Sequence, residues 1–182
     1  MASENRRAVP PTDLPLSAAA LQLIADATAE SARLHHEYIG TEHLLLALGH
    51  DSREQAPLAA LAVTPRRAAL RISEMIQDGS TKRHKVPLDP RELNLPEEVI
   101  RWLAERSQSS IDVPPDIERP FTSRTKRALS LAADSARELA HTHVGVAEVI
   151  VGIMRESKNI AAQVLAAEGL TADRAYEYAR QQ

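Results

Sequence analysis

Cysteine is absent from this 182-residue chain, and aromatic residues make up only 3% of it. Without cysteine there is no disulfide, no thiolate metal ligand and no cysteine nucleophile, and the composition fits a reducing compartment. Because aromatics are scarce, a core has to be built from Leu, Ala, Val and Ile. The abundance of alanine among these residues favours helices that pack closely together.

Long apolar runs and a strong excess of one charge are also missing. Apolar runs such as Leu44 to Leu48 are far too short to cross a bilayer. Residues 1–11 are polar and no apolar segment follows them, so no signal peptide is expected. The net charge of −3 gives no reason to expect a nucleic-acid partner. With 43% hydrophobic and 26% charged residues, the chain is typical of a globular protein, and we expect it to be cytoplasmic, without a membrane partner.

The chain contains an internal duplication. The segment Leu34–Gly40 reappears as Leu139–Gly145, at an offset of 105 residues that continues upstream without a gap. Downstream the second copy is two residues longer, and Val63–Thr64 matches Leu170–Thr171 at an offset of 107. Each copy reads as a helix, a tight loop, a second helix, a short helix and a final helix.

Polar residues and a glycine mark the ends of these helices. Ser17 and Thr122 are placed to cap the first helix of each copy, and Thr41 is placed to cap the second helix of copy one. Thr171 precedes the last helix, and Gly169 stands where a helix C-cap belongs.

Two apolar segments decide the fold class. Leu44–Leu48 is apolar on every side, which predicts a central, buried helix. Its counterpart Val149–Val151 is β-branched and by itself would indicate a strand, but its equivalence to the leucine-rich segment favours a helix. We therefore predict an all-α fold of two tandem four-helix repeats with an extended insertion between them.

Residues 80–118 have no counterpart in either copy. They begin with a basic cluster and are interrupted by prolines, and one helix is expected around Trp102, the only tryptophan. The expected organisation is a flexible tail at 1–13, a first repeat at 14–79, this linker, and a second repeat at 119–182. The linker helix either packs back on the repeats or docks a partner, and the sequence leaves both readings open.

The segment Ala32–Leu45, ARLHHEYIGTEHLL, closely resembles the signature of the N-terminal repeat domain of Clp unfoldases, especially the ClpC type. Pro120–Arg127 and Ile160–Leu165 resemble two further segments of that domain. The resemblance implies two four-helix repeats related by a pseudo-two-fold axis, which receive substrates or adaptors ahead of AAA+ modules. This chain has no Gly-x-x-x-x-Gly-Lys-Ser/Thr loop for ATP, so we expect either a stand-alone repeat domain without AAA+ modules or a piece of a longer protein.

The resemblance also implies a ligand site at the start of the second helix. ClpC-type domains bind phosphorylated arginine, and the motif match carries that role onto Gly40, Thr41, Glu42 and His43. Free N–H groups at the helix N-terminus, together with Thr41, would hold the phosphoryl anion, and the Glu42 carboxylate would pair with the guanidinium. The alternative is that Thr41 and Glu42 only cap the helix and balance its dipole.

The second copy departs from this pattern. Val146 and Ala147 stand where the first copy has Thr41 and Glu42. Glu148 comes one position late and would point about 100° around the helix. We therefore predict one competent pocket or none, but not two.

A second surface of the family domain lies between the repeats and binds adaptors or, in some actinobacterial members, cyclic peptide antibiotics. The resemblance places Leu16 and Phe121, which open the two copies, at this groove. Leu16 replaces an aromatic residue of the family, which argues against antibiotic binding. The alternative for Phe121 is a packing role in the core or between the repeats.

Histidines cluster in the first copy, where His36, His43 and His50 suggest a metal site. The helix lacks the second histidine of a His-Glu-x-x-His zinc motif, however. His36 and His141 recur at matched positions, which indicates side chains that fix the loop by hydrogen bonds. No nucleophile is flanked by a recognisable base. We therefore expect no metal, no cofactor and no enzymatic activity.

These observations predict a recognition module of the Clp protease system. Its expected partner is a Clp-family unfoldase, an adaptor or an arginine-phosphorylated protein. In the alternative reading the chain is a regulatory or decoy protein, which binds its partner elsewhere and leaves the phosphoarginine pocket idle.

Overall fold

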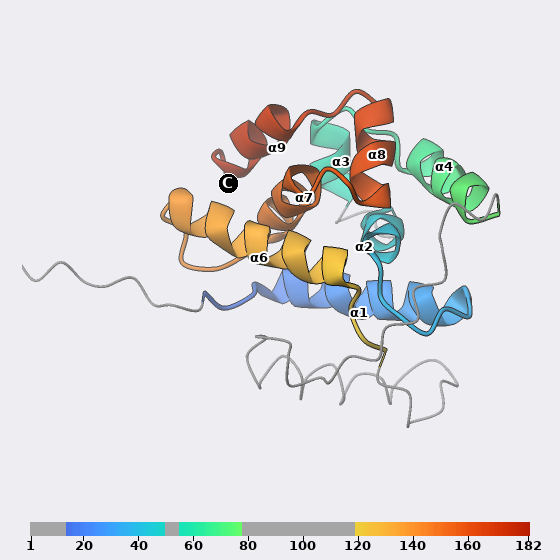
Figure 1. Ribbon diagram of the computed structural model, residues 1–182. Coiled ribbons are helices and arrows are strands. Elements are labelled where there is room, and N and C mark those ends of the chain that lie inside the picture. The colour runs from blue at the N-terminus through green and yellow to red at the C-terminus, as the bar shows by residue number, and fades with distance from the viewer. Residues whose placement is uncertain (1–13, 50–54, 78–118) are drawn as a thin grey trace, which may run out of the picture.

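The computed structural model describes residues 14–49, 55–77 and 119–182, which form helices joined by loops (Figure 1). The first repeat comprises α1 (Ala18–Arg33), α2 (Thr41–Leu48), α3 (Gln55–Ala60) and α4 (Pro65–Gln77). The second comprises α6 (Ser123–Glu138), α7 (Val146–Arg155), α8 (Ile160–Ala167) and α9 (Ala172–Ala179). The described residues form no strand apart from two isolated bridges, so the predicted all-α fold is confirmed. The expected tail at 1–13 and linker at 80–118, with its helix around Trp102, lie outside the described residues.

Polar caps begin three helices where the sequence predicts them. Ser17 Oγ accepts the N–H of Ala20 at 3.1 Å ahead of α1, and Thr122 Oγ1 accepts the N–H of Thr125 at 3.2 Å ahead of α6. Thr171 caps α9 in the same way. Each cap satisfies one amide that the helix leaves free and stabilises the protein by about 1 kcal/mol.

The predicted cap of α2 is wrong. Gly40 is the N-cap, in an extended conformation with φ −96° and ψ 171°, and Thr41 is the first helical residue. Gly40 has no side chain that could accept an amide of the helix, and instead the His43 side chain, inside the helix, accepts a hydrogen bond from the Gly40 N–H. In the second repeat α7 begins similarly, with Gly145 as N-cap and Glu148 as the acceptor.

The central helices are α2 and α7, as predicted. Every residue of α2 is buried, and α7 is buried from Ala147 to Met154. Apolar side chains of both repeats belong to one continuous core, which explains why the β-branched run of α7 is helical despite its propensity. At Gly152 the two helices α6 and α7 approach so closely that a Cβ would overlap the Ala128 carbonyl and the Ala132 amide.

A pseudo-two-fold axis relates the two repeats. The chain ahead of α1 pairs with the loop of the second repeat through a Leu16–Val144 bridge. The chain ahead of α6 pairs with the loop of the first repeat through the Ile39–Phe121 bridge. The two bridges are equivalent, because the offset of 105 residues relates Leu16 to Phe121 and Ile39 to Val144. Four backbone hydrogen bonds of 2.8 to 3.0 Å accompany the bridges: Val144 N to Pro15 O, Ser17 N to Val144 O, Ile39 N to Pro120 O and Thr122 N to Ile39 O. Each repeat therefore holds the loop of the other.

Left-handed residues recur at matched positions and agree with both sequence offsets. His35 (φ 55°) and Ala140 (φ 57°) follow the first helix of each repeat, and Ala62 (φ 60°) and Gly169 (φ 87°) follow the third. Gly169 is the only glycine of the four, so the third helix ends with less backbone strain in the second repeat.

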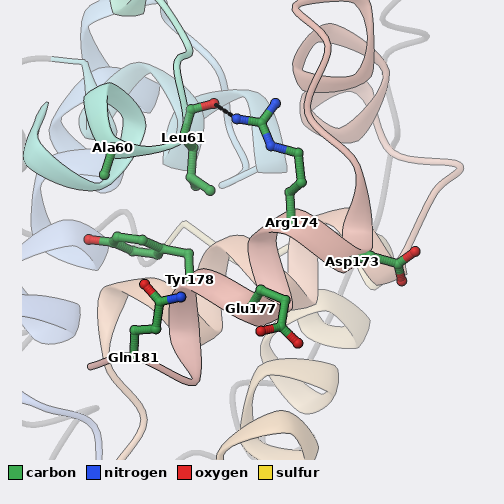
Figure 2. A pocket seen from close by; sticks show the side chains of 7 residues that line it. All are labelled: Ala60, Leu61, Asp173, Arg174, Glu177, Tyr178 and Gln181. Atoms are coloured by element: carbon green, nitrogen blue, oxygen red, sulfur yellow. Dashed lines mark hydrogen bonds between the residues drawn. The ribbon is translucent and has the colours of Figure 1, made fainter.

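Charged side chains add to the contacts between the repeats. Glu168, at the end of α8, pairs with Arg71 of α4 at 2.7 Å. Arg174 of α9 donates a hydrogen bond to the Leu61 carbonyl at 3.2 Å, beside a pocket of about 320 Å³ that lies between α9 and the turn after α3 (Figure 2). Among the described residues, no helix is both long and apolar enough to cross a membrane.

Candidate functional site

The four residues predicted to bind a ligand lie together at the N-terminus of α2. Gly40, Thr41, Glu42 and His43 are all buried, and the exposed fraction is 6% for Glu42 and 0% for His43. The backbone N–H groups of the first helical turn and the positive end of the helix dipole lie at the same place. One helical turn therefore combines a buried carboxyl group with a backbone environment that favours anions.

His43 fixes the loop to the start of α2. Its Nδ1 accepts the Gly40 N–H at 2.7 Å, and its Nε2 lies 2.9 Å from Nδ1 of His36. Because Nδ1 is an acceptor, the proton of the neutral ring lies on Nε2 and is donated to His36. The prediction that His36 fixes the loop by a hydrogen bond is confirmed.

Both imidazole rings are neutral at physiological pH. Burial, followed by the charges of His36 and Arg119, lowers the pKa of His43 to about 3. Burial also lowers the pKa of His36. A second proton on His43 would face the Gly40 N–H, and one on His36 would face the His43 N–H, so the hydrogen bonds also oppose protonation.

Glu42 is buried beside Tyr38, whose hydroxyl donates to its carboxyl group. Burial raises the pKa of Glu42, while its own backbone N–H and the Tyr38 hydroxyl act in the opposite direction. Burial, followed by the charge and hydrogen bond of Glu42, raises the pKa of Tyr38 to about 12. The carboxyl group occupies the space that a Cβ on Gly40 would need, which explains the glycine at this N-cap.

Three rings line the site on the side of the loop. His36 stacks on Tyr38 with ring centroids 5.2 Å apart, and His43 meets His36 edge-on at 5.0 Å. His36 and Tyr38 are half-buried, whereas Glu42 and His43 are buried. Tyr38 is therefore the more accessible of the two side chains that interact through the Glu42 carboxyl group.

A metal ion is a second use for these side chains, because ligand atoms of His36, Glu42 and His43 all lie within 4.8 Å of one another. The hydrogen bonds argue against it. A metal on Nε2 of a neutral His43 ring would move the ring proton to Nδ1, where it would face the Gly40 N–H. Metal binding would thus break the bond that begins α2. His50, the third histidine of the suggested site, lies outside the described residues.

Arg119 is a member of the site that the sequence did not predict. Its Nε donates to the His36 carbonyl at 2.8 Å, and its charge contributes to the lowered pKa of His43. Arg119 directly precedes Pro120, whose carbonyl pairs with the Ile39 amide. Its place at the site therefore depends on the crossing of the repeats, for which no local sequence signal exists.

The second repeat uses the equivalent positions differently. Glu148, the counterpart of His43, accepts the Gly145 N–H at 2.7 Å and lies 3.0 Å from Nδ1 of His141. His141 therefore fixes its loop as His36 does. The Glu148 carboxylate is already engaged by the loop, and Val146 and Ala147 carry no polar side chain. The two helix N-termini therefore differ in the side chains that they present.

The two residues predicted at the adaptor groove lie at equivalent bridges between the repeats. Leu16 is half-buried beside Val144, whereas Phe121 is 2% exposed and belongs to the core. The packing alternative for Phe121 is therefore confirmed in this conformation, and its role at a groove stays a prediction.

The chain is similar to known sequences over most of its length. Residues 3–63 and 96–168 match the family model of the Clp repeat (R) N-terminal domain. The chloroplastic chaperone proteins ClpC1 of Oryza sativa subsp. japonica and ClpC of Pisum sativum are each 29% identical to it over 156 residues. That alignment covers 85% of this chain but 13% of each relative, so the chain spans a small part of their length.

Two solved structures share the fold. The N-terminal domain of the chaperone ClpD from Arabidopsis thaliana has a TM-score of 0.56 at 19% identity, with 91% of this chain and 95% of that chain covered. The Hsp104 N-terminal domain from Candida albicans has a TM-score of 0.58 at 11% identity, with coverage of 91% and 89%. At these identities the likeness concerns the fold alone.

Proposed function

Since the chain belongs to the Clp repeat (R) N-terminal domain family, we propose that it is a non-catalytic recognition module that binds substrates or adaptors of a Clp unfoldase. The relatives named above are Clp chaperones, and this chain aligns with only 13% of their length. On this proposal, the chain carries out only the recognition of a substrate or adaptor. A cytoplasmic location, facing a Clp unfoldase in the same compartment, is part of the proposal.

The proposed ligand is a phosphorylated arginine on a substrate protein. The observation that carries this is the Glu42 carboxyl group within the first turn of α2, beside the helix N-terminus that begins at Gly40. Phosphoarginine is dipolar, with an anionic phosphoryl group on one side and a delocalised guanidinium on the other. Helix N–H groups suit the anion, and a carboxylate suits the guanidinium.

Ligand entry requires one exchange of partners. In the free protein the Tyr38 hydroxyl donates to Glu42, and the guanidinium of the ligand would take over this bond. The exchange replaces a neutral donor with a charged, bidentate one, which is the stronger arrangement. Because the loop is held by His36 and His43, only the half-buried Tyr38 needs to move.

Calorimetric titration with a phosphoarginine peptide tests the ligand, with the same peptide unphosphorylated as the reference. We expect one site per chain and a loss of affinity of about tenfold or more in Glu42→Gln, which keeps the shape of the side chain and removes the charge. Glu148→Gln, at the start of α7, is the matched control and should leave the affinity unchanged. Two sites per chain, or equal affinity in Glu42→Gln, would contradict the assignment.

The burial of Glu42 and its bond to Tyr38 favour one alternative, in which the pocket is idle and the chain is a regulatory or decoy protein. A degradation assay with the cognate unfoldase separates the two. A module that delivers substrates accelerates degradation of an arginine-phosphorylated protein, whereas a decoy slows it.

A further inference from the structure

Arg119 is a cation at the N-terminus of α2 that comes from the other repeat. The chain ahead of α6 crosses to the first repeat at the Ile39–Phe121 bridge and brings the guanidinium beside the loop. Its Nε is tied to the His36 carbonyl at 2.8 Å, so the head group is held in place while the residue is only half-buried. No other residue that the structure describes accepts a hydrogen bond from its remaining N–H groups, which can serve a further partner.

Nothing in the described part of the chain neutralises this cation. No carboxylate there forms an ion pair with Arg119, and the only effect of its surroundings on its pKa is the lowering caused by burial. Glu42, the nearby carboxyl group, is hydrogen-bonded to Tyr38. Among the described residues Arg119 thus has no carboxylate partner, and it lies beside the positive end of the α2 dipole and beside His43, whose pKa it lowers. The guanidinium charge and the helix dipole both favour an anion at this place.

The equivalent place in the second repeat has no such charge. The offset of 105 relates Arg119 to Leu14, which packs against the apolar core near the loop of the second repeat. The pseudo-two-fold axis therefore places a cation at one helix N-terminus and an apolar side chain at the other. This difference is independent of the difference at Thr41 and Glu42.

We propose that Arg119 binds the phosphoryl group of the ligand, so that the site is composite and a bound ligand joins the two repeats. This rests on the proposed function for the ligand as a whole, in which Glu42 takes the guanidinium side. The two charges then match the two ends of the ligand, with Arg119 and the α2 amides at the phosphoryl group. An unphosphorylated arginine has no anionic phosphoryl group to neutralise Arg119, so it would bind more weakly.

The test uses the full chain with Arg119→Gln and Arg119→Lys. Glutamine keeps an N–H that can donate to the His36 carbonyl, so a purely structural role of Arg119 would survive the change. Lysine keeps the charge. Arg180→Gln, which removes one exposed positive charge directly after α9, is the matched control. Circular dichroism verifies that each variant is folded.

For the phosphoarginine peptide we expect affinity to fall about 10- to 100-fold in Arg119→Gln, to recover in part in Arg119→Lys, and to stay unchanged in Arg180→Gln. The salt dependence of binding should also weaken in Arg119→Gln. Equal affinity of the wild type and Arg119→Gln overturns the role of Arg119 and leaves the proposed ligand intact.

Inorganic phosphate, monitored by ³¹P line broadening, is the second probe. If the wild type binds phosphate and Arg119→Gln does not, while the peptide binds to neither, then the phosphoarginine assignment fails and Arg119 stands as an anion-binding residue. If the wild type binds neither probe, both proposals are overturned.

Discussion

The bond between His43 and His36 makes a quantitative prediction about stability in acid. His43 is fully buried, and its pKa in the folded protein is about 3, against about 6.5 in an unfolded chain. Below pH 6.5 the His43 side chain is therefore protonated in the unfolded chain but stays neutral in the folded protein. The contribution of His43 to stability is complete above this pH and is lost as the pH falls toward 3.

The perturbation is His43→Gln. Glutamine can accept the Gly40 N–H through its amide oxygen and donate its amide N–H to His36, so both hydrogen bonds of His43 are retained without a titrating group. Glutamine is also a common residue at this position of a helical capping box. At pH 7 we expect the free energy of unfolding to lie within about 1 kcal/mol of the wild type.

Between pH 7 and pH 5 the two proteins should diverge. Each pH unit below 6.5 costs the wild type about 1.4 kcal/mol through His43, or about 2 kcal/mol by pH 5, and this loss is absent from the variant. Urea unfolding followed by circular dichroism at both pH values measures the difference. The remaining titrating groups are common to both proteins and cancel. Equal losses of stability between pH 7 and pH 5 would refute the hydrogen-bond scheme at the start of α2.

Three further substitutions test the packing and the access to the site. Gly152→Ala should destabilise the protein by about 1–3 kcal/mol in urea unfolding, because its Cβ would overlap the backbone of α6; a gain in stability would show that α6 and α7 are further apart. Phe121→Ala should cost about 3–5 kcal/mol in the same assay, since the ring is buried between the repeats, and a loss below 1 kcal/mol would place it at the surface. Tyr38→Phe removes the hydroxyl that occupies Glu42 and should tighten binding of the phosphoarginine peptide by up to about tenfold in calorimetry; weaker binding would make Tyr38 a ligand contact instead.

Much of the fold follows from the duplication. Val149–Val151 has a strand propensity, and only its match to Leu44–Leu48 predicts the helix that is observed. Caps such as Ser17 and Thr122 are predictable because a hydroxyl ahead of a helix acts within one turn of chain. Thr41 is not the cap because the helix begins one residue earlier than predicted, so that Gly40 is the N-cap and Thr41 is the first helical residue.

The site was predictable only in part. The motif match brings Gly40 to His43 together because they are consecutive in sequence, and the recurrence of His36 and His141 indicates their hydrogen bonds. The partners of these histidines, His43 and Glu148, differ between the repeats, so recurrence alone does not identify them.

The position of Arg119 at the site could not be predicted, for a different reason. It reaches the loop because two segments about 80 residues apart pair at the Ile39–Phe121 bridge, a consequence of the pseudo-two-fold arrangement and of no local pattern. Tyr38 was visible in the motif, but its bond to Glu42 depends on how the loop turns back over α2.

The central claim is that one site, at the start of α2, reads phosphorylated arginine. An NMR titration of the ¹⁵N-labelled chain with a phosphoarginine peptide tests it most directly. We expect amide shifts at Gly40, Thr41 and Glu42 that saturate at one peptide per chain. Shifts at Gly145 and Glu148, or no shift at the first set, would contradict it.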